Sequence, residues 1–159
     1  MIPPGEEGKV AIKVNTKGYG GRTLKKYIYI ITNDEKNSKL KLTIAGEVES
    51  FALITPKKIK LRGSLDKPVT ANVKIVPKKK YPFKIISTRL KKEGYIKYDL
   101  KKINGSNGHE YLLYVENIKK KKGRYFNVIY LTTDSKIKRE IKISIYGDIF
   151  KKDVQEGKN

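Results

Sequence analysis

Three short runs of lysine are the residues whose type and spacing best suit a chemical role in this sequence. They lie in or beside predicted turns and comprise Lys57, Lys58, Lys78, Lys79, Lys80, Lys119, Lys120, Lys121 and Lys122. Clustered ammonium groups attract a polyanion because binding releases the counterions condensed on the polymer. Anionic lipid headgroups and acidic polymers of the cell envelope would be attracted in the same way. These nine lysines are therefore the candidate contacts to a polyanion.

Groups that could hold a metal or transfer protons are sparse. His109 is the sole histidine, and no second ligand type lies near it in the sequence, so a surface position is expected. Neighbouring carboxylates occur at turns or strand ends, where solvation is their usual role; they are Glu6 with Glu7, Asp34 with Glu35, and Glu47 with Glu49. Cysteine, a phosphate-cradling glycine loop and a nucleophilic-serine motif are all missing from the sequence. We expect no enzyme activity, no catalytic, cofactor-binding or metal-binding residue, and no cofactor.

The net charge of +21 over 159 residues has two competing explanations. Only five of the 37 basic residues are arginine, whose planar fork suits phosphate, and an AT-rich genome would encode the lysines readily. Codon bias is thus the favoured explanation. The charge is nevertheless uneven: residues 1–50 carry nine basic and six acidic residues, and residues 51–150 carry 25 and eight. Polyanion binding stays open as the alternative function, although we do not expect a nucleic-acid partner.

Alternation of apolar and polar residues indicates an all-β chain. Ile141, Ile143 and Ile145 alternate with Lys142 and Ser144, which places the apolar set on one face of a strand. Helical periodicity and a membrane-spanning apolar run of about 18 residues are both missing from the sequence. Further strands are predicted over residues 10–14, 69–76, 83–88, 95–100 and 111–115. The predicted fold class is an immunoglobulin-like β-sandwich.

An internal repeat organises the chain. A Gly-Arg pair, an apolar strand ending in Thr-x-Asp, and an alternating strand containing glycine occur at residues 21–48 and again at 123–149. The offset is 102 at the leading glycines, 100 at the aspartates and 101 at the later glycines. This period matches the roughly 100 residues of one immunoglobulin-like domain.

The repeat predicts one complete domain preceded by part of another. Residues 51–150 supply a full set of strands, whereas residues 1–50 supply the last three strands, and residues 151–159 read as a disordered tail. Three strands would leave an apolar face in water, which costs about 25 cal/mol per Å². We therefore expect either a fragment of a longer protein, the favoured alternative, or cover of that face by the second domain or another chain.

The motifs of the first copy resemble those of a known family. Ile2-Pro3-Pro4-Gly5-Glu6, then Thr32-Asn33-Asp34, then Leu42-Thr43-Ile44-Ala45-Gly46 resemble a bacterial immunoglobulin-like domain family of unknown function, related to Hydin-type domains. Residues 2–48 cover the back half of that pattern. The resemblance implies a periplasmic or extracellular protein of the cell envelope whose domains act as binding or scaffold modules. Its protein partner is not indicated by any motif.

Overall fold

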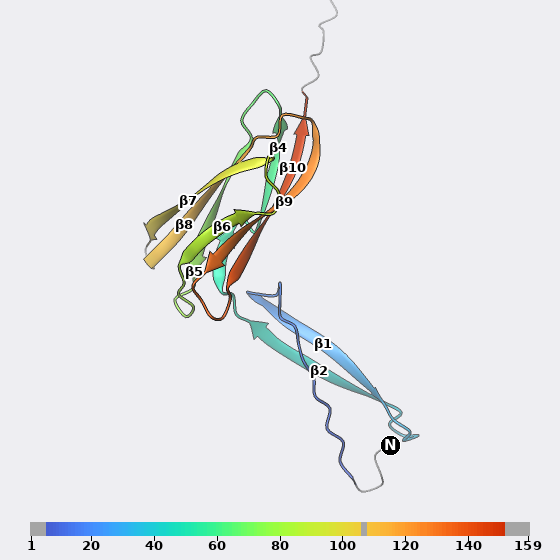
Figure 1. The fold of residues 1–159 in the computed structure, drawn as a ribbon. Helices are drawn as coiled ribbons and strands as arrows, with labels where there is room; N and C mark the ends of the chain where they lie inside the picture. The colour runs from blue at the N-terminus through green and yellow to red at the C-terminus, as the bar shows by residue number, and fades with distance from the viewer. Residues whose placement is uncertain (1–5, 106–107, 152–159) are drawn as a thin grey trace, which may run out of the picture. The chain divides into compact units, whose positions relative to one another are not determined.

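The computed structural model describes residues 6–105 and 108–151, and the regular elements of these residues are all strands (Figure 1). The chain divides into two compact units, Met1–Ser50 and Phe51–Asn159. The predicted all-β class is therefore confirmed. Most of the predicted disordered tail, residues 152–159, lies outside the described residues.

The first unit is a β-hairpin. Strand β1 (Arg22–Ile31) pairs antiparallel with β2 (Lys39–Val48) over their whole length. Ile28 lies opposite Leu42 and Ile30 opposite Leu40, so the alternation places apolar side chains of both strands on one face. Most of these side chains remain partly exposed, since a two-stranded sheet covers little of its own surface.

The strand predicted over residues 10–14 is not formed. Residues 6–16 have no strand assignment, and Val10 and Ile12 are 59% and 41% exposed. Alternation alone cannot make a strand, because the backbone N–H and C=O groups also need a neighbouring strand with which to pair. The described part of the first unit thus has two paired strands where the sequence predicted three, and its assignment as the end of an immunoglobulin-like domain stays a prediction.

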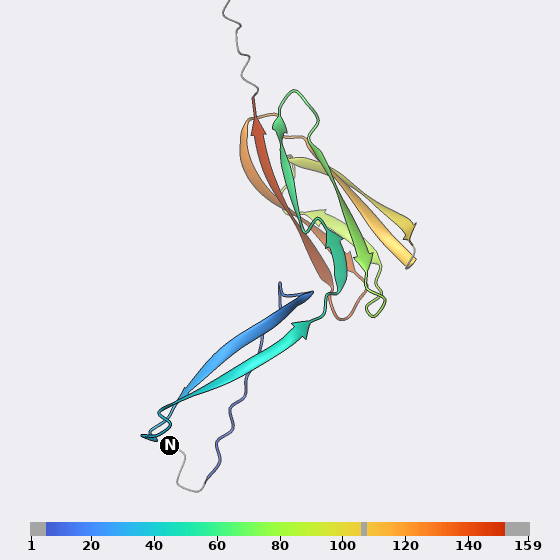
Figure 2. The same ribbon diagram turned by 180° about the vertical axis from the view of Figure 1, so that it is seen from behind.

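The second unit is a sandwich of two four-stranded sheets, which Figures 1 and 2 show from opposite sides. One sheet has the order β4-β10-β9-β6 and the other the order β3-β5-β8-β7. The strands are β3 (Ala52–Thr55), β4 (Lys58–Ser64), β5 (Thr70–Pro77), β6 (Ile85–Leu90), β7 (Ile96–Gly105), β8 (Gly108–Asn117), β9 (Gly123–Thr133) and β10 (Glu140–Phe150). Strand β4 runs parallel to β10, and the other neighbours are antiparallel. These strand neighbours match the immunoglobulin-like arrangement, with its first strand divided between the sheets at the cis Thr55–Pro56 bond.

The core lies between the two sheets. Alternate residues of β5 and β8 face alternate residues of β9 and β10, and the most deeply buried are Val73, Ile75, Leu113, Val115, Ile129, Leu131, Ile143 and Ile145, all 0% exposed. The predicted alternation over residues 69–76, 111–115 and 141–145 therefore chose the buried face correctly. This burial is the principal force holding the sheets together, because the two inner faces remove each other's apolar side chains from water.

The hairpins β1-β2 and β9-β10 have the same register at a uniform offset of 101. Leu24 pairs with Gly46 as Tyr125 pairs with Gly147, and the other cross-strand pairs follow the same rule. The turns correspond as well: the hydroxyl of Thr32 donates to the carbonyl of residue 37 at 2.7 Å, and that of Thr133 donates to the carbonyl of residue 138 at 2.5 Å. The offsets between the two copies, which vary from 100 to 102 in the sequence, thus become a single offset of 101 in the paired strands.

The Tyr125 side chain packs against the core and lies directly over Gly147 on the neighbouring strand β10. Its hydroxyl donates to Oδ1 of Asn117 at 2.8 Å, and its ring stacks on that of Tyr95 with centroids 5.3 Å apart. The ring lies so close to Gly147 that a Cβ there would meet ring carbons at 2.0–2.4 Å. Burial raises the pKa of Tyr125 to about 12, because the ionised phenolate would be poorly solvated there.

Candidate binding surface

The order of the strands in the β4-β10-β9-β6 sheet gathers outward side chains into one surface. Inward residues of these strands are buried, and the intervening ones point away from the core. Lys91 continues the β6 ladder, since its N–H donates to the carbonyl of Val128 at 2.9 Å. We call this surface the basic face; its charged and aromatic members are Lys58, Lys60, Arg62, Arg89, Lys91, Arg124, Phe126, Tyr130, Glu140, Lys142, Tyr146, Asp148 and, at the end of β10, Phe150.

The basic face carries seven cationic side chains and two carboxylates, an excess of five positive charges. Three of the five arginines of the chain lie on it, namely Arg62, Arg89 and Arg124. The side chains of Arg62 and Arg124 are 77% and 87% exposed. Cations held close together on one surface raise the local potential and attract anions.

The opposite outer face, on the β3-β5-β8-β7 sheet, has no such excess among its charged strand residues. Lys74 pairs with Glu110 at 2.5 Å, Lys97 with Glu116 at 3.1 Å, and Lys101 with Asp99 at 3.9 Å. The hydrogen bond from Lys97, and then that from Tyr114, hold the pKa of Glu116 below its ordinary value, so this carboxylate stays charged. Three lysines thus face three acids. We call this surface the neutral face.

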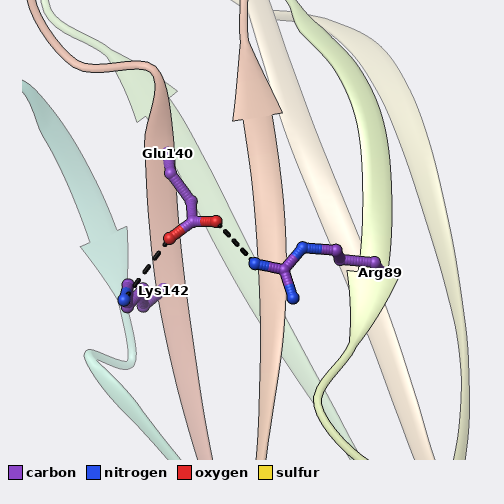
Figure 3. A network of polar contacts seen from close by, with 3 residues as sticks. All are labelled: Arg89, Glu140 and Lys142. Atoms are coloured by element: carbon purple, nitrogen blue, oxygen red, sulfur yellow. Dashed lines mark hydrogen bonds and ion pairs between the residues drawn. The ribbon is translucent and has the colours of Figure 1, made fainter.

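A cation–π cluster surrounds Tyr130 on β9, near the end of the basic face where β10 begins. The Arg89 guanidinium carbon lies 3.7 Å from the ring centroid, and the Lys142 ammonium lies 5.1 Å from it. Glu140 joins both cations, with oxygens 2.9 Å from Arg89 Nη2 and 3.4 Å from Lys142 Nζ. Figure 3 shows Arg89 reaching from β6 across β9 toward Glu140 on β10. The guanidinium of Arg89 thus contacts the Tyr130 ring and the Glu140 carboxylate at the same time.

Two aromatic side chains lie exposed beside that cluster. Phe126 on β9 and Tyr146 on β10 are directly opposite each other, with ring centroids 5.1 Å apart and planes tilted by 52°. They are 42% and 43% exposed. Lys91 lies 5.9 Å from the Phe126 ring, and Lys58 lies 5.9 Å from the Tyr146 ring. The aromatic pair is therefore flanked by cations on both sides.

The structure does not bring the nine predicted lysines together. Lys78, Lys79 and Lys80 lie in the β5–β6 connection, at the end of the sandwich where β8 begins. The run from Lys119 to Lys122 lies in the β8–β9 connection, at the end where β8 finishes, and β8 is ten residues long. Lys57 is exposed in the turn before β4, and Lys58 is the one member of the predicted set on the basic face. A single contact surface built from all three runs is therefore not formed.

His109 lies exposed at the start of β8. Across residues 6–105 and 108–151, no three histidine, cysteine or acidic side chains come together as they would to hold a metal ion. Asp34 instead stabilises the turn in which it lies. The Asn37 side chain and the Lys36 N–H donate hydrogen bonds to its carboxylate, and these bonds lower the pKa of Asp34. Within the part of the chain that the structure describes, no helix is long and apolar enough to cross a membrane.

The basic face was not predicted from the sequence, because its members are scattered over residues 58–150. Each run of lysines is visible along the chain, whereas Arg62, Arg89 and Arg124 occur singly. The available signal was the outward set of the alternating strands: Lys58, Lys60 and Arg62 occupy alternate positions of one segment. Which outward sets lie side by side depends on the sheet order, which periodicity does not determine.

Comparison with known proteins gives no family. No family model matches the chain, and no curated protein matches it. Among solved structures, mouse clustered PcdhgC3 EC1-3 is 10% identical with a TM-score of 0.39, and Protocadherin Gamma C5 EC1-3 is 12% identical with a TM-score of 0.39. The matches cover 89% of this chain and 47% and 48% of those chains, so the chain spans about half their length. These likenesses assign neither a partner nor an activity.

Proposed function

We propose that this chain is a non-enzymatic immunoglobulin-like binding module of a bacterial cell-envelope protein, and that it engages acidic partners through the basic face. The observation that carries the proposal is the contrast between the two outer faces of one sandwich. The basic face has five cations in excess, and the neutral face has its three lysines balanced by three acids.

Codon bias does not explain that contrast. An AT-rich genome would enrich lysine at every solvent-facing position, so both outer faces would gain the same excess. It would not favour arginine, yet three arginines share the basic face. Arginine is also the side chain that binds phosphate and carboxylate groups in two places. A selected anion-binding surface accounts for both the location of the charge and its residue type.

The location in the envelope rests on the resemblance of residues 2–48 to the bacterial family. We expect the protein in the periplasm or outside the cell, with its immunoglobulin-like units acting as binding or scaffold modules. Fractionation of the producing cells, followed by detection with an antibody against this chain, tests the location. Recovery in the cytosolic fraction alone would contradict it.

Binding to inorganic polyphosphate tests the use of the basic face. The variant Arg62→Gln/Arg124→Gln/Lys142→Gln removes three charges from that face, and Lys120→Gln/Lys121→Gln/Lys122→Gln removes three from the predicted lysine run. The first variant should reduce the slope of log affinity against log salt by about 2, whereas the second should leave it nearly unchanged. Equal losses in the two variants would show that net charge alone governs binding.

A further inference from the structure

We propose that the basic face binds single-stranded nucleic acid, with unpaired bases stacked on Phe126 and Tyr146 and phosphates held by the surrounding cations. This inference rests on the proposed anion-binding role of that face and names its ligand. It departs from the expectation drawn from the sequence, that nucleic acid is not a partner, because the sequence did not show an exposed aromatic pair among the cations. It does not depend on the proposed cellular location.

The two rings are placed as a stacking surface. They lie on β9 and β10, the two central strands of their sheet, and more than two fifths of each side chain is exposed. Neither ring belongs to the core, because the core side of both strands is filled by other residues. Exposed aromatic rings on the face of a sheet offer a flat apolar surface to nucleobases, every one of which has a π-face.

The cations lie where a phosphate backbone would pass. Lys58, Lys60 and Arg62 line the β4 edge of the face, while Arg89 and Lys91 lie on the β6 side. The aromatic pair lies between these two rows, since the sheet order is β4-β10-β9-β6. A single-stranded nucleic acid whose bases contact the rings would therefore keep its phosphates near ammonium or guanidinium groups. Proteins that bind single strands without sequence preference use this combination.

Double-stranded DNA fits this surface poorly. Four strands spaced about 4.8 Å apart make a face about 14 Å wide before side chains are counted. The major groove is about 12 Å wide and admits a helix or a two-stranded ribbon, so this sheet could touch a duplex only at its phosphates. Bases within a duplex also stack on one another, so they expose no ring face to Phe126 and Tyr146. The phosphates of the duplex cannot stack on these two side chains in their place.

A polymer with charge alone would leave the aromatic pair unused. Polyphosphate, anionic vesicles and acidic peptides would interact with the cations of the basic face, but they present no planar ring to the two side chains. The aromatic contribution is therefore the property that separates a single-stranded nucleic acid from other polyanions. It also separates this inference from the proposed function in an experiment.

The test compares the full chain bound to three probes: a 15-nucleotide oligothymidylate, an abasic oligonucleotide of equal length, and inorganic polyphosphate. Fluorescence anisotropy should show at least about tenfold tighter binding to the oligothymidylate than to the abasic strand, because base stacking on aromatic rings contributes that much. Phe126→Leu/Tyr146→Leu should abolish this difference while leaving polyphosphate binding unchanged. The stringent control is a second pair of exposed rings in the first unit, Tyr27 and Tyr29, which have Lys41 and Lys39 at 4.0 and 4.4 Å from their centroids. If the bases stack on the basic face, Tyr27→Leu/Tyr29→Leu should leave the difference unchanged.

Each outcome decides the inference. Equal affinity for the oligothymidylate and the abasic strand, or equal loss in both leucine pairs, overturns it and leaves polyanion binding intact. Failure to bind any of the three probes overturns the proposed function with it. Vesicles of anionic lipid serve as a fourth probe, and tighter binding to them than to the oligothymidylate also overturns the inference, since a membrane would then be the better occupant. Circular dichroism of each variant confirms that the sandwich is intact, so that a loss of binding reports on the face.

Discussion

Replacement of Gly147 by alanine tests whether the Tyr125 ring is fixed across β10. An added Cβ would lie 2.0 Å from Cε1 and 2.2 Å from Cζ of that ring, whereas carbon atoms in contact are normally about 3.5–4.0 Å apart. The ring would have to move by about 1.5 Å to restore normal contact. That movement would disrupt its hydrogen bond to Asn117 and its stacking on Tyr95.

Overpacking of this kind costs about 1–3 kcal/mol. For a unit of this size, a loss of 2 kcal/mol lowers the melting temperature by roughly 10 °C. Thermal unfolding followed by far-ultraviolet circular dichroism measures the change. The matched control is Gly46→Ala, which occupies the corresponding position of the first hairpin and would meet no atom within 4 Å.

The expected order of melting temperatures is therefore wild type and Gly46→Ala together, with Gly147→Ala well below them. In a Tyr125→Leu background the same alanine should cost less, because the ring that it meets is gone. A Gly147→Ala protein that melts within about 2 °C of the wild type would refute the reasoning, as it would place the shift below the range expected for overpacking.

Three further predictions concern contacts of the sandwich, the first of them with a control substitution. Lys74→Met should lower the free energy of unfolding in urea by about 1–3 kcal/mol, because the buried Glu110 carboxylate loses its partner; Lys101→Met, on the same face with an exposed partner, should change it by less than about 0.5 kcal/mol. The raised pKa of Tyr125 means that its protonated side chain stabilises the folded state; this stabilisation is complete below pH 10 and is lost as the pH rises toward 12. The urea midpoint should therefore fall less steeply between pH 10 and 12 in Tyr125→Phe than in the wild type. Equal slopes of urea midpoint against pH in the two proteins would contradict the assignment. Asn127→Leu should accelerate amide hydrogen exchange at Lys92, since the fully buried Asn127 side chain accepts from the N–H of that residue and donates to its carbonyl.

Strand faces were predictable because the information for them is local. In β10, Ile141, Ile143 and Ile145 alternate with polar residues, and the two-residue repeat of a strand decides that these three share a side. Once one side carries branched apolar residues, burial in a sandwich follows. Residues 10–14 mark where this reasoning ends, since the same alternation without a paired neighbour gives no strand.

The sequence by itself determined the all-β class, the hairpins and the side of each paired strand that faces the core, because side-chain direction follows from the pleat of the backbone. Only the tertiary structure decided which outward side chains are neighbours. Arg62, Arg89 and Arg124 come from β4, β6 and β9, and they share a face because β10 and β9 lie between the two outer strands. Sheet order depends on contacts between residues far apart in the chain, and hydrogen bonding and core packing select it, so no local pattern specifies it.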